Sequence, residues 1–187
     1  MNMKRFISLV TLLLLSASVM MAQDAPKRYG VKSATVKAVT EVMGQKVEGV
    51  SYFDDYGALE AGKSQANGME ILTVSRDGKS YMIVPSAKQV REIPVQESVN
   101  YLNLTDEVIE KYKIKEIGKD VVAGKDCIKY SMEVSQMGQT AKLTVSVWNG
   151  YAMKTVSSTM GMVLMVVVTE FNEGEVDPSL FVIPSFK

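Results

Sequence analysis

The chain of 187 residues contains no histidine and one cysteine, Cys127. Without histidine there is no Ser-His-Asp or Cys-His arrangement to activate a nucleophile, and the common zinc sites lose their usual ligand. A single cysteine cannot close an intramolecular disulfide, so we expect Cys127 to pack as a small buried hydrophobe. The sequence therefore predicts no catalytic residue, no metal site and no cofactor, and it argues against an enzyme.

Net charge is also absent, because 21 basic residues balance 21 acidic ones. The basic residues form no cluster or stripe along the chain. Nucleic-acid binding needs such a basic surface, so no nucleic-acid partner is expected. The length suits one domain with a sizeable core.

The N-terminus carries a targeting pattern. Lys4 and Arg5 precede an apolar segment, Phe6 to Ala22, and a polar stretch begins at Gln23. A basic start, an apolar middle and a small-residue exit are typical of a secretory signal peptide. An uncleaved anchor helix is the alternative, since the apolar segment approaches the length of a membrane span. We expect cleavage of residues 1–22 and a periplasmic or secreted single domain over 23–187, with no integral membrane span.

Strand patterns dominate the rest of the chain. The longest apolar run beyond the signal, Met162 to Val168, is too short to cross a bilayer and indicates a strand buried on both faces. One helix is predicted, with Thr105 as its N-cap and its end near Lys113. Alternating apolar and polar residues predict earlier strands over 31–42, 46–53, 59–65, 69–76, 79–84 and 89–95.

Three short turns set the pairing of the last four predicted strands. Met137-Gly138, Asn149-Gly150 and Met160-Gly161 each fall where a two-residue hairpin turn is expected. Directly opposed residues share a face of the sheet. The pairing set by these turns therefore places the apolar side chains on one face, which we call the inner face. The candidate ligand-binding residues on this face are Ile128, Tyr130, Met132, Leu143, Val145, Val147, Val156, Val163, Met165 and Val167.

The opposite, outer face becomes apolar only at Met162, Leu164, Val166 and Val168, and we expect the C-terminal segment 180–183 to cover it there. Lys154 interrupts the inner face. Either an extra residue near the turn at Gly150 reverses the phase of the strand, or the lysine projects into the apolar surface to meet an anionic head group.

Several stretches resemble an uncharacterised family of secreted proteins from Gram-negative bacteria. They are YFDDYGALEA (Tyr52 to Ala61), GKDVVAGKDCIKYSMEV (Gly118 to Val134) with the pair Val147-Trp148, and DPSLFVIPSFK (Asp177 to Lys187). That family is similar in fold to the periplasmic lipoprotein carriers LolA and LolB. The resemblance implies a mainly β protein: a single antiparallel, strongly curved sheet of about ten or eleven strands, forming an unclosed barrel with helical cover.

In the carriers the concave apolar face receives the acyl chains of lipoproteins. This chain departs from them in having one predicted helix where they use several as a lid. No functional residue of the carriers is placed on this sequence.

Two functions remain open at this point. An unclosed barrel leaves an apolar concavity that would suit a lipid, an acyl chain or an acylated protein, unless the same side chains form a filled core under the helix. The alternative is a non-catalytic structural or protein-interaction module of the cell envelope, which grips an envelope protein through exposed strand edges.

Overall fold

The computed structural model describes residues 27–66, 68–95, 98–136, 139–159 and 162–186. The segment predicted as a signal peptide and the predicted turns Met137-Gly138 and Met160-Gly161 lie outside the described residues. Within the described ranges, no helix has the length and hydrophobicity needed to cross a membrane.

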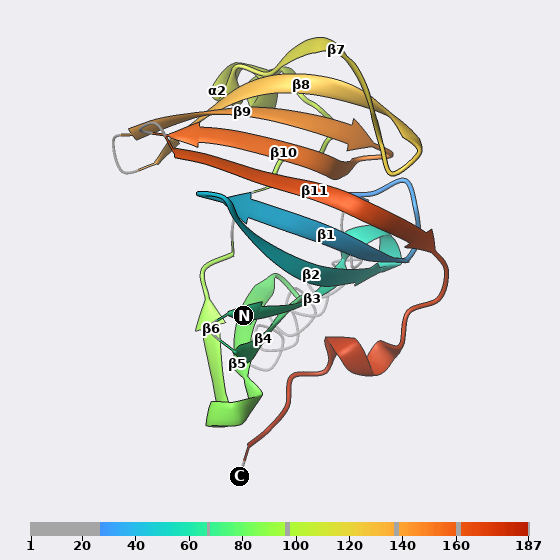
Figure 1. Cartoon of the computed structure of the whole chain (residues 1–187). Coiled ribbons are helices and arrows are strands. Elements are labelled where there is room, and N and C mark those ends of the chain that lie inside the picture. Colours follow the sequence, from blue (N-terminus) through green and yellow to red (C-terminus); the bar gives the residue numbers. More distant parts are fainter. Residues whose placement is uncertain (1–26, 67, 96–97, 137–138, 160–161, 187) are drawn as a thin grey trace, which may run out of the picture.

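The described chain is built around one antiparallel sheet (Figure 1). Its strands are β1 (Ala34–Val42), β2 (Gln45–Asp54), β3 (Leu59–Ala66), β4 (Met69–Arg76), β5 (Lys79–Val84), β6 (Gln89–Ile93), β7 (Lys115–Val122), β8 (Lys125–Gln136), β9 (Gln139–Trp148), β10 (Tyr151–Thr159) and β11 (Met162–Glu173). In space the eleven strands follow the order β6-β5-β4-β3-β2-β1-β11-β10-β9-β8-β7. Among these described strands, the two at the edges, β6 and β7, do not pair with each other. The mainly β fold class and the unclosed barrel are therefore confirmed.

Tight turns account for the hairpins. Asp77-Gly78 joins β4 to β5, with φ of 54° and 71° at its two residues. Asn149-Gly150 joins β9 to β10, with φ of 45° and 79°. Positive φ at both central positions matches the right-handed twist of the flanking strands, which is why Asn, Asp and Gly are favoured there.

Within the described residues, α-helical cover comes from one short element. In α2 (Asp106–Tyr112), the Thr105 side chain accepts a hydrogen bond from the Val108 backbone N–H at 3.3 Å, as the sequence predicts for an N-cap. The residues before it, 98–104, form a connection that we call the strap. The strap and α2 pack over buried side chains of β8 and β9, among them Met132 and Val145.

The C-terminal segment packs in a different place from the one expected. Beyond β11, Val176 and Phe181, the latter in the short helix η3 (Pro178–Phe181), cluster with Ala61, Val74 and Ile83 of β3, β4 and β5. The expectation that this segment covers the outer face of β11 is therefore wrong. It instead provides the second layer over the N-terminal half of the sheet.

The predicted inner face is confirmed over β8 and β9, and we use the name for the side of the whole sheet that carries Tyr130 and Val145. These two residues are paired directly. In β10, Ala152 pairs with Val147 and Lys154 pairs with Ser146, which leaves Met153 as an extra residue. A bulge of this kind moves every later side chain to the other face.

The face predictions beyond the bulge are therefore wrong. The residues that lie on the outer face instead of the inner face are Lys154, Val156, Val163, Met165 and Val167. Conversely, Val166 lies opposite Thr155, which in turn lies opposite Val145, so Val166 belongs to the inner face. Of the two interpretations of Lys154, reversal of phase is confirmed, and the extra residue sits within the strand.

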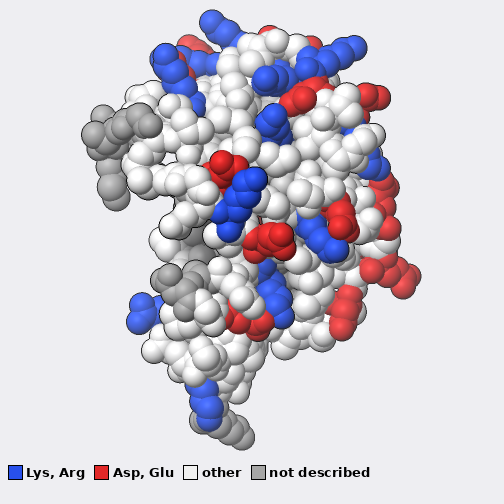
Figure 2. Space-filling model, viewed as in Figure 1, with Lys and Arg blue, Asp and Glu red and all other residues white. Residues whose placement is uncertain are grey.

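Figure 2 shows one side of the molecule, where basic and acidic side chains are interspersed without a patch of one sign. This pattern agrees with the balanced composition. Cys127 is buried, with 2% of its surface exposed, and burial raises the pKa of its thiol. The expectation that Cys127 packs as a buried hydrophobe is confirmed.

Candidate functional site

The strap and α2 do not fill the space over the inner face, and a cavity of about 1060 Å³ lies between them and the sheet. This volume is at the upper end of the range for small-molecule sites. Most of its lining is apolar. The larger apolar and aromatic side chains of the lining include Val99, Tyr101, Tyr112, Met132, Val134, Leu143, Val145 and Leu164. We call it the strap cavity.

Aromatic packing fixes one wall of the strap cavity. The Tyr101 ring, on the strap, stacks on the Tyr130 ring of β8 with centroids 5.8 Å apart and an interplanar angle of 25°. The Tyr101 hydroxyl donates to the Met132 sulfur at 3.4 Å. Burial, with a contribution from Tyr130, raises the pKa of Tyr101 to about 12. The strap is therefore held to β8 by contacts that exclude water.

The structure places part of the predicted ligand-binding set at this cavity. Met132, Leu143 and Val145 line it. Tyr130 and Val147 belong to the apolar cluster beneath the strap and α2. These five come from β8 and β9, where the predicted register is confirmed.

The rest of the set lies elsewhere. Ile128 is 41% exposed and lines a different cavity, beside Cys127. Val156 lines a second cavity, of about 720 Å³, that also reaches Met132 and Leu143 beside the end of α2. Val163, Met165 and Val167, from β11, line neither the strap cavity nor this second one.

Lys154 faces away from the strap cavity. Its ammonium lies 3.9 Å from the Asp120 carboxylate of β7. A hydrogen bond from the Ser146 hydroxyl, at 2.8 Å, is the main cause that lowers the pKa of Asp120, and Lys154 adds to it. The interpretation of Lys154 as an inner-face contact for an anionic head group is therefore wrong.

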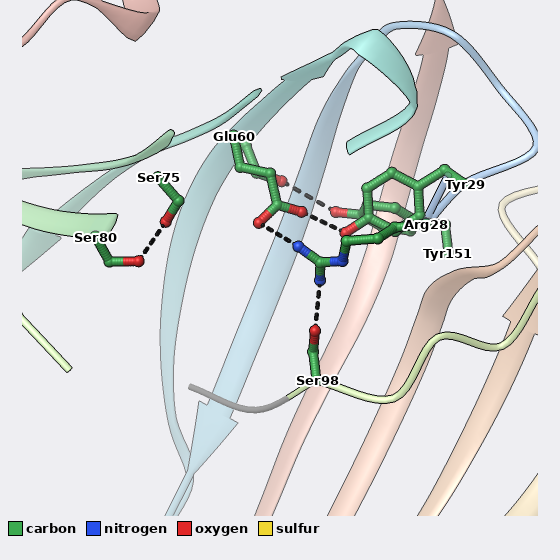
Figure 3. Close-up of polar contacts among 8 residues, drawn as sticks. Arg28, Tyr29, Glu60, Ser75, Ser80, Ser98 and Tyr151 are labelled. Carbon is green, nitrogen blue, oxygen red and sulfur yellow. Dashed lines mark hydrogen bonds and ion pairs between the residues drawn. The ribbon is translucent and has the colours of Figure 1, made fainter. Parts of the chain in front are cut away.

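Sequence reasoning missed a cluster of polar side chains at the strap cavity (Figure 3). Arg28 and Tyr29 precede β1 and both line the cavity. The Tyr29 hydroxyl donates to Glu60 Oε1 at 2.5 Å, and Arg28 Nη1 lies 3.0 Å from Glu60 Oε2. Arg28 Nη2 also donates to the Ser98 hydroxyl of the strap at 2.8 Å. We call Arg28, Tyr29 and Glu60 the polar cluster.

Aromatic rings surround the polar cluster. Tyr29 is 9% exposed, and its ring centroid lies 4.6 Å from that of Phe53 and 5.0 Å from that of Tyr151. Burial, with a contribution from the Glu60 carboxylate, raises the pKa of the Tyr29 phenol far above its usual range. Tyr29 therefore stays protonated and keeps donating to Glu60. Residues 28 and 60 are distant in sequence, and no local pattern could have paired them.

A smaller cavity, of about 250 Å³, lies on the other half of the sheet and reaches the same cluster. We call it the polar cavity. Its lining is Ser51, Tyr52, Phe53, Glu60, Ala61, Gly62, Thr73, Ser75 and Tyr151. The hydroxyls of Ser51 and Tyr151 lie 3.2 Å apart, and that of Ser75 lies 2.7 Å from that of Ser80.

The described residues contain no group of three or more His, Cys, Asp or Glu side chains that could hold a metal ion. The strap cavity and the polar cluster offer an apolar surface for contact, rings for stacking, and hydroxyls with one ion pair for hydrogen bonding.

No protein-family model matches the chain, and no curated protein matches its sequence. Solved structures do match its fold. A chain in the complex of MucA and MucB from Pseudomonas aeruginosa aligns at a TM-score of 0.59 and 16% identity, over 81% of this chain and 56% of that chain. An uncharacterized conserved protein from Thermus thermophilus aligns at a TM-score of 0.59 and 12% identity, over 83% of this chain and 87% of that chain.

A further structure, of MucB alone, aligns at a TM-score of 0.56 and 16% identity, over 91% of this chain and 64% of that chain. This protein therefore spans a little over half the length of the chain in the MucA/MucB complex. At such identities the likeness shows the fold alone. Together with the unclosed sheet, it agrees with the architecture that the sequence resemblance implies, a single curved antiparallel sheet that forms an unclosed barrel.

Proposed function

We propose that this protein is an exported envelope protein that binds a hydrophobic ligand, a lipid or an acyl chain, in the strap cavity. The observation that carries the proposal is the volume of about 1060 Å³ left between the inner face and the strap, with a mostly apolar lining. Apolar surface costs about 25 cal/mol per Å² to leave in water. A ligand with a hydrocarbon chain removes that cost by covering the walls.

The walls suit a flexible chain. Met132, Leu143 and Val145 line the sheet side, and Val99 lines the strap side. Methionine adapts its shape to varied apolar partners, while Leu and Val give a firm surface. None of these side chains can act on a bond of the ligand, so the proposal is binding without catalysis.

Export rests on the N-terminal pattern of two basic residues followed by an apolar segment. A periplasmic or secreted location agrees with the fold. MucB, which shares the fold, has been solved in complex with MucA(peri).

The test is to purify the exported protein from its host, extract it with organic solvent and identify any bound lipid by mass spectrometry. The emptied protein is then titrated with the neutral dye N-phenyl-naphthylamine, whose fluorescence rises in apolar sites. Leu143→Ala should weaken dye binding about tenfold, because contact with a buried side chain is lost.

Val163→Ala is the matched control, since Val163 is 52% exposed and lies on the outer face. Its dye affinity should equal that of the wild type. A clean lipid extract together with no dye uptake would refute the proposal.

A protein partner is the second candidate function. Its support is a pair of open sheet edges, β6 and β7, and exposed apolar side chains beside one of them: Val121 and Ile117 of β7 are 66% and 49% exposed. Unpaired strand edges can add a strand from another chain. A protein that contains no lipid but captures an extended peptide along β7 would favour this function.

A further inference from the structure

The two halves of the inner face differ in chemistry. The β8–β9 half is apolar, as described above. On the other half, the rows of directly paired residues are mostly small or hydroxyl-bearing over β2 to β4. One row is Ser51, Gly62 and Thr73, on β2, β3 and β4, and it continues to Met82 and Arg91 on β5 and β6. The next row is Phe53, Glu60, Ser75 and Ser80, on β2 to β5, and it ends at Ile93 of β6. A chain-like ligand lying across the sheet would therefore meet apolar side chains at one end and hydroxyls at the other.

The polar cluster joins the two halves. Arg28 and Tyr29 line the strap cavity, and Glu60, to which both are bonded, lines the polar cavity. The side chain of Tyr151 also lines the polar cavity, and its ring packs against that of Tyr29. Side chains that line the polar cavity are thus bonded to, or packed against, side chains that line the strap cavity.

From this arrangement we infer that the polar cavity is the head-group subsite of the proposed ligand, and that it takes a neutral, hydroxyl-bearing group of the polyol class. The inference rests on the proposed function, because it names the other end of the molecule whose chain fills the strap cavity. A volume of about 250 Å³ equals that of roughly eight liquid waters, which is enough for a glycerol unit or a single sugar ring.

Charge selects the class of head group. The Arg28 guanidinium and the Glu60 carboxylate neutralise each other at 3.0 Å. An anionic head group would face the Glu60 carboxylate, which lines the polar cavity, and a cationic one would have to compete with the Arg28 guanidinium for that carboxylate. Leaving either charge without a partner in a partly buried site is costly. A neutral group with hydroxyls meets no such penalty.

Hydrogen-bonding capacity points the same way. Hydroxyl groups both donate and accept, and those of Ser51, Thr73, Ser75 and Tyr151 all line the polar cavity. Gly62 makes room for one of them, because a Cβ there would lie 2.6 Å from Thr73 Oγ1. A polyol matches such a lining because each of its hydroxyls can also donate and accept.

The experiment compares ligands that differ only in the head group: monodecanoylglycerol, decanoate and decyltrimethylammonium, each used below its critical micelle concentration to displace N-phenyl-naphthylamine at neutral pH. We expect monodecanoylglycerol to bind about tenfold more tightly than either charged ligand.

Variants locate the preference. Thr73→Val keeps the shape of the side chain and removes its hydroxyl, so affinity for monodecanoylglycerol should fall about threefold to tenfold, with the other two ligands unchanged. Thr40→Val is the matched control: Thr40 lies on the inner face of β1 and lines neither cavity, so this variant should behave as the wild type. In Glu60→Gln the side-chain amide oxygen still accepts from the Tyr29 hydroxyl, but the Arg28 guanidinium loses its anionic partner. The affinity of this variant for decanoate, relative to that for monodecanoylglycerol, should therefore rise.

Equal affinity for the three ligands in the wild type, or an unchanged preference in Thr73→Val, overturns the head-group subsite while leaving chain binding in place. Absence of dye uptake by the wild type, together with a clean lipid extract, overturns the proposed function itself. The unfolding midpoint of each variant, measured in urea, shows whether a loss of binding is a loss of folding.

Discussion

Gly150 offers the sharpest test of how the N-terminal segment and the strap are held over the sheet. It has a φ of +79°, and a Cβ added there would lie 2.5 Å from the Arg28 carbonyl oxygen and 2.7 Å from Leu102 Cγ. Gly124, in the turn between β7 and β8, has a φ of +73° with nothing within 4 Å of such a Cβ. Gly150→Ala and Gly124→Ala therefore share the backbone strain and differ in the clash.

Left-handed backbone at alanine costs about 1 kcal/mol. Gly124→Ala should lower the free energy of unfolding by that amount. Overpacking against a backbone oxygen and a leucine adds about 1–3 kcal/mol, so Gly150→Ala should cost about 2–4 kcal/mol. For a chain of this size, the corresponding losses in Tm are about 2–4 °C and about 5–15 °C.

Urea and thermal unfolding measure both variants, and dye titration measures the strap cavity. The clash displaces Arg28 and Leu102, so Gly150→Ala should also weaken dye binding, whereas Gly124→Ala should not. Equal destabilisation of the two variants would refute the argument that the turn is in contact with the N-terminal segment and the strap.

The packing and the pKa shifts lead to three more predictions. Phe181→Ala should lower the free energy of unfolding, measured in urea, by about 3–5 kcal/mol, because Phe181 is 2% exposed and packs against the sheet. Val182→Ala, at a position 58% exposed, should change it by less than about 0.5 kcal/mol. Similar values for the two variants would contradict the C-terminal packing. The pKa of Tyr101 is raised from 10.0 to about 12, so its burial stabilises the fold fully below pH 10, and that contribution is lost as the pH rises toward 12. Tyr101→Phe should therefore lose less stability across this window than the wild type, and parallel profiles would count against the burial of its phenol. Cys127 should react with a thiol reagent much faster in denaturing urea than in the native state, since it is 2% exposed and burial raises its pKa; equal rates would show that the thiol is accessible.

Local chemistry made much of the fold predictable. Asp77-Gly78 encodes its turn through two residues that accept positive φ, and Thr105 encodes a helix start through one side-chain oxygen. The pairing of β8 with β9 was predicted from the expected turn at Met137-Gly138 and supported by alternation, because a slip of one residue would have exposed its apolar face.

The error in the candidate site beyond β9 came from one residue. Met153 is an extra residue in β10, and each side chain after it changed face. Met153 is fully buried, with 0% of its surface exposed, so its apolar character did not mark it as irregular. Bulges are fixed by the packing around them, and here the surroundings include residues as distant in the chain as Phe53 and Val168.

The sequence by itself determined the alternation of the strands, the turns at Asp77-Gly78 and Asn149-Gly150, the helix cap and the burial of the lone cysteine, because each depends on neighbours along the chain. Only the tertiary structure decided that Arg28 meets Glu60, that the strap leaves a cavity over β8 and β9, and that the C-terminal segment covers β3 to β5. These contacts join residues far apart in sequence, and they form because the central pairing of β1 with β11 brings the two halves of the chain into one curved sheet.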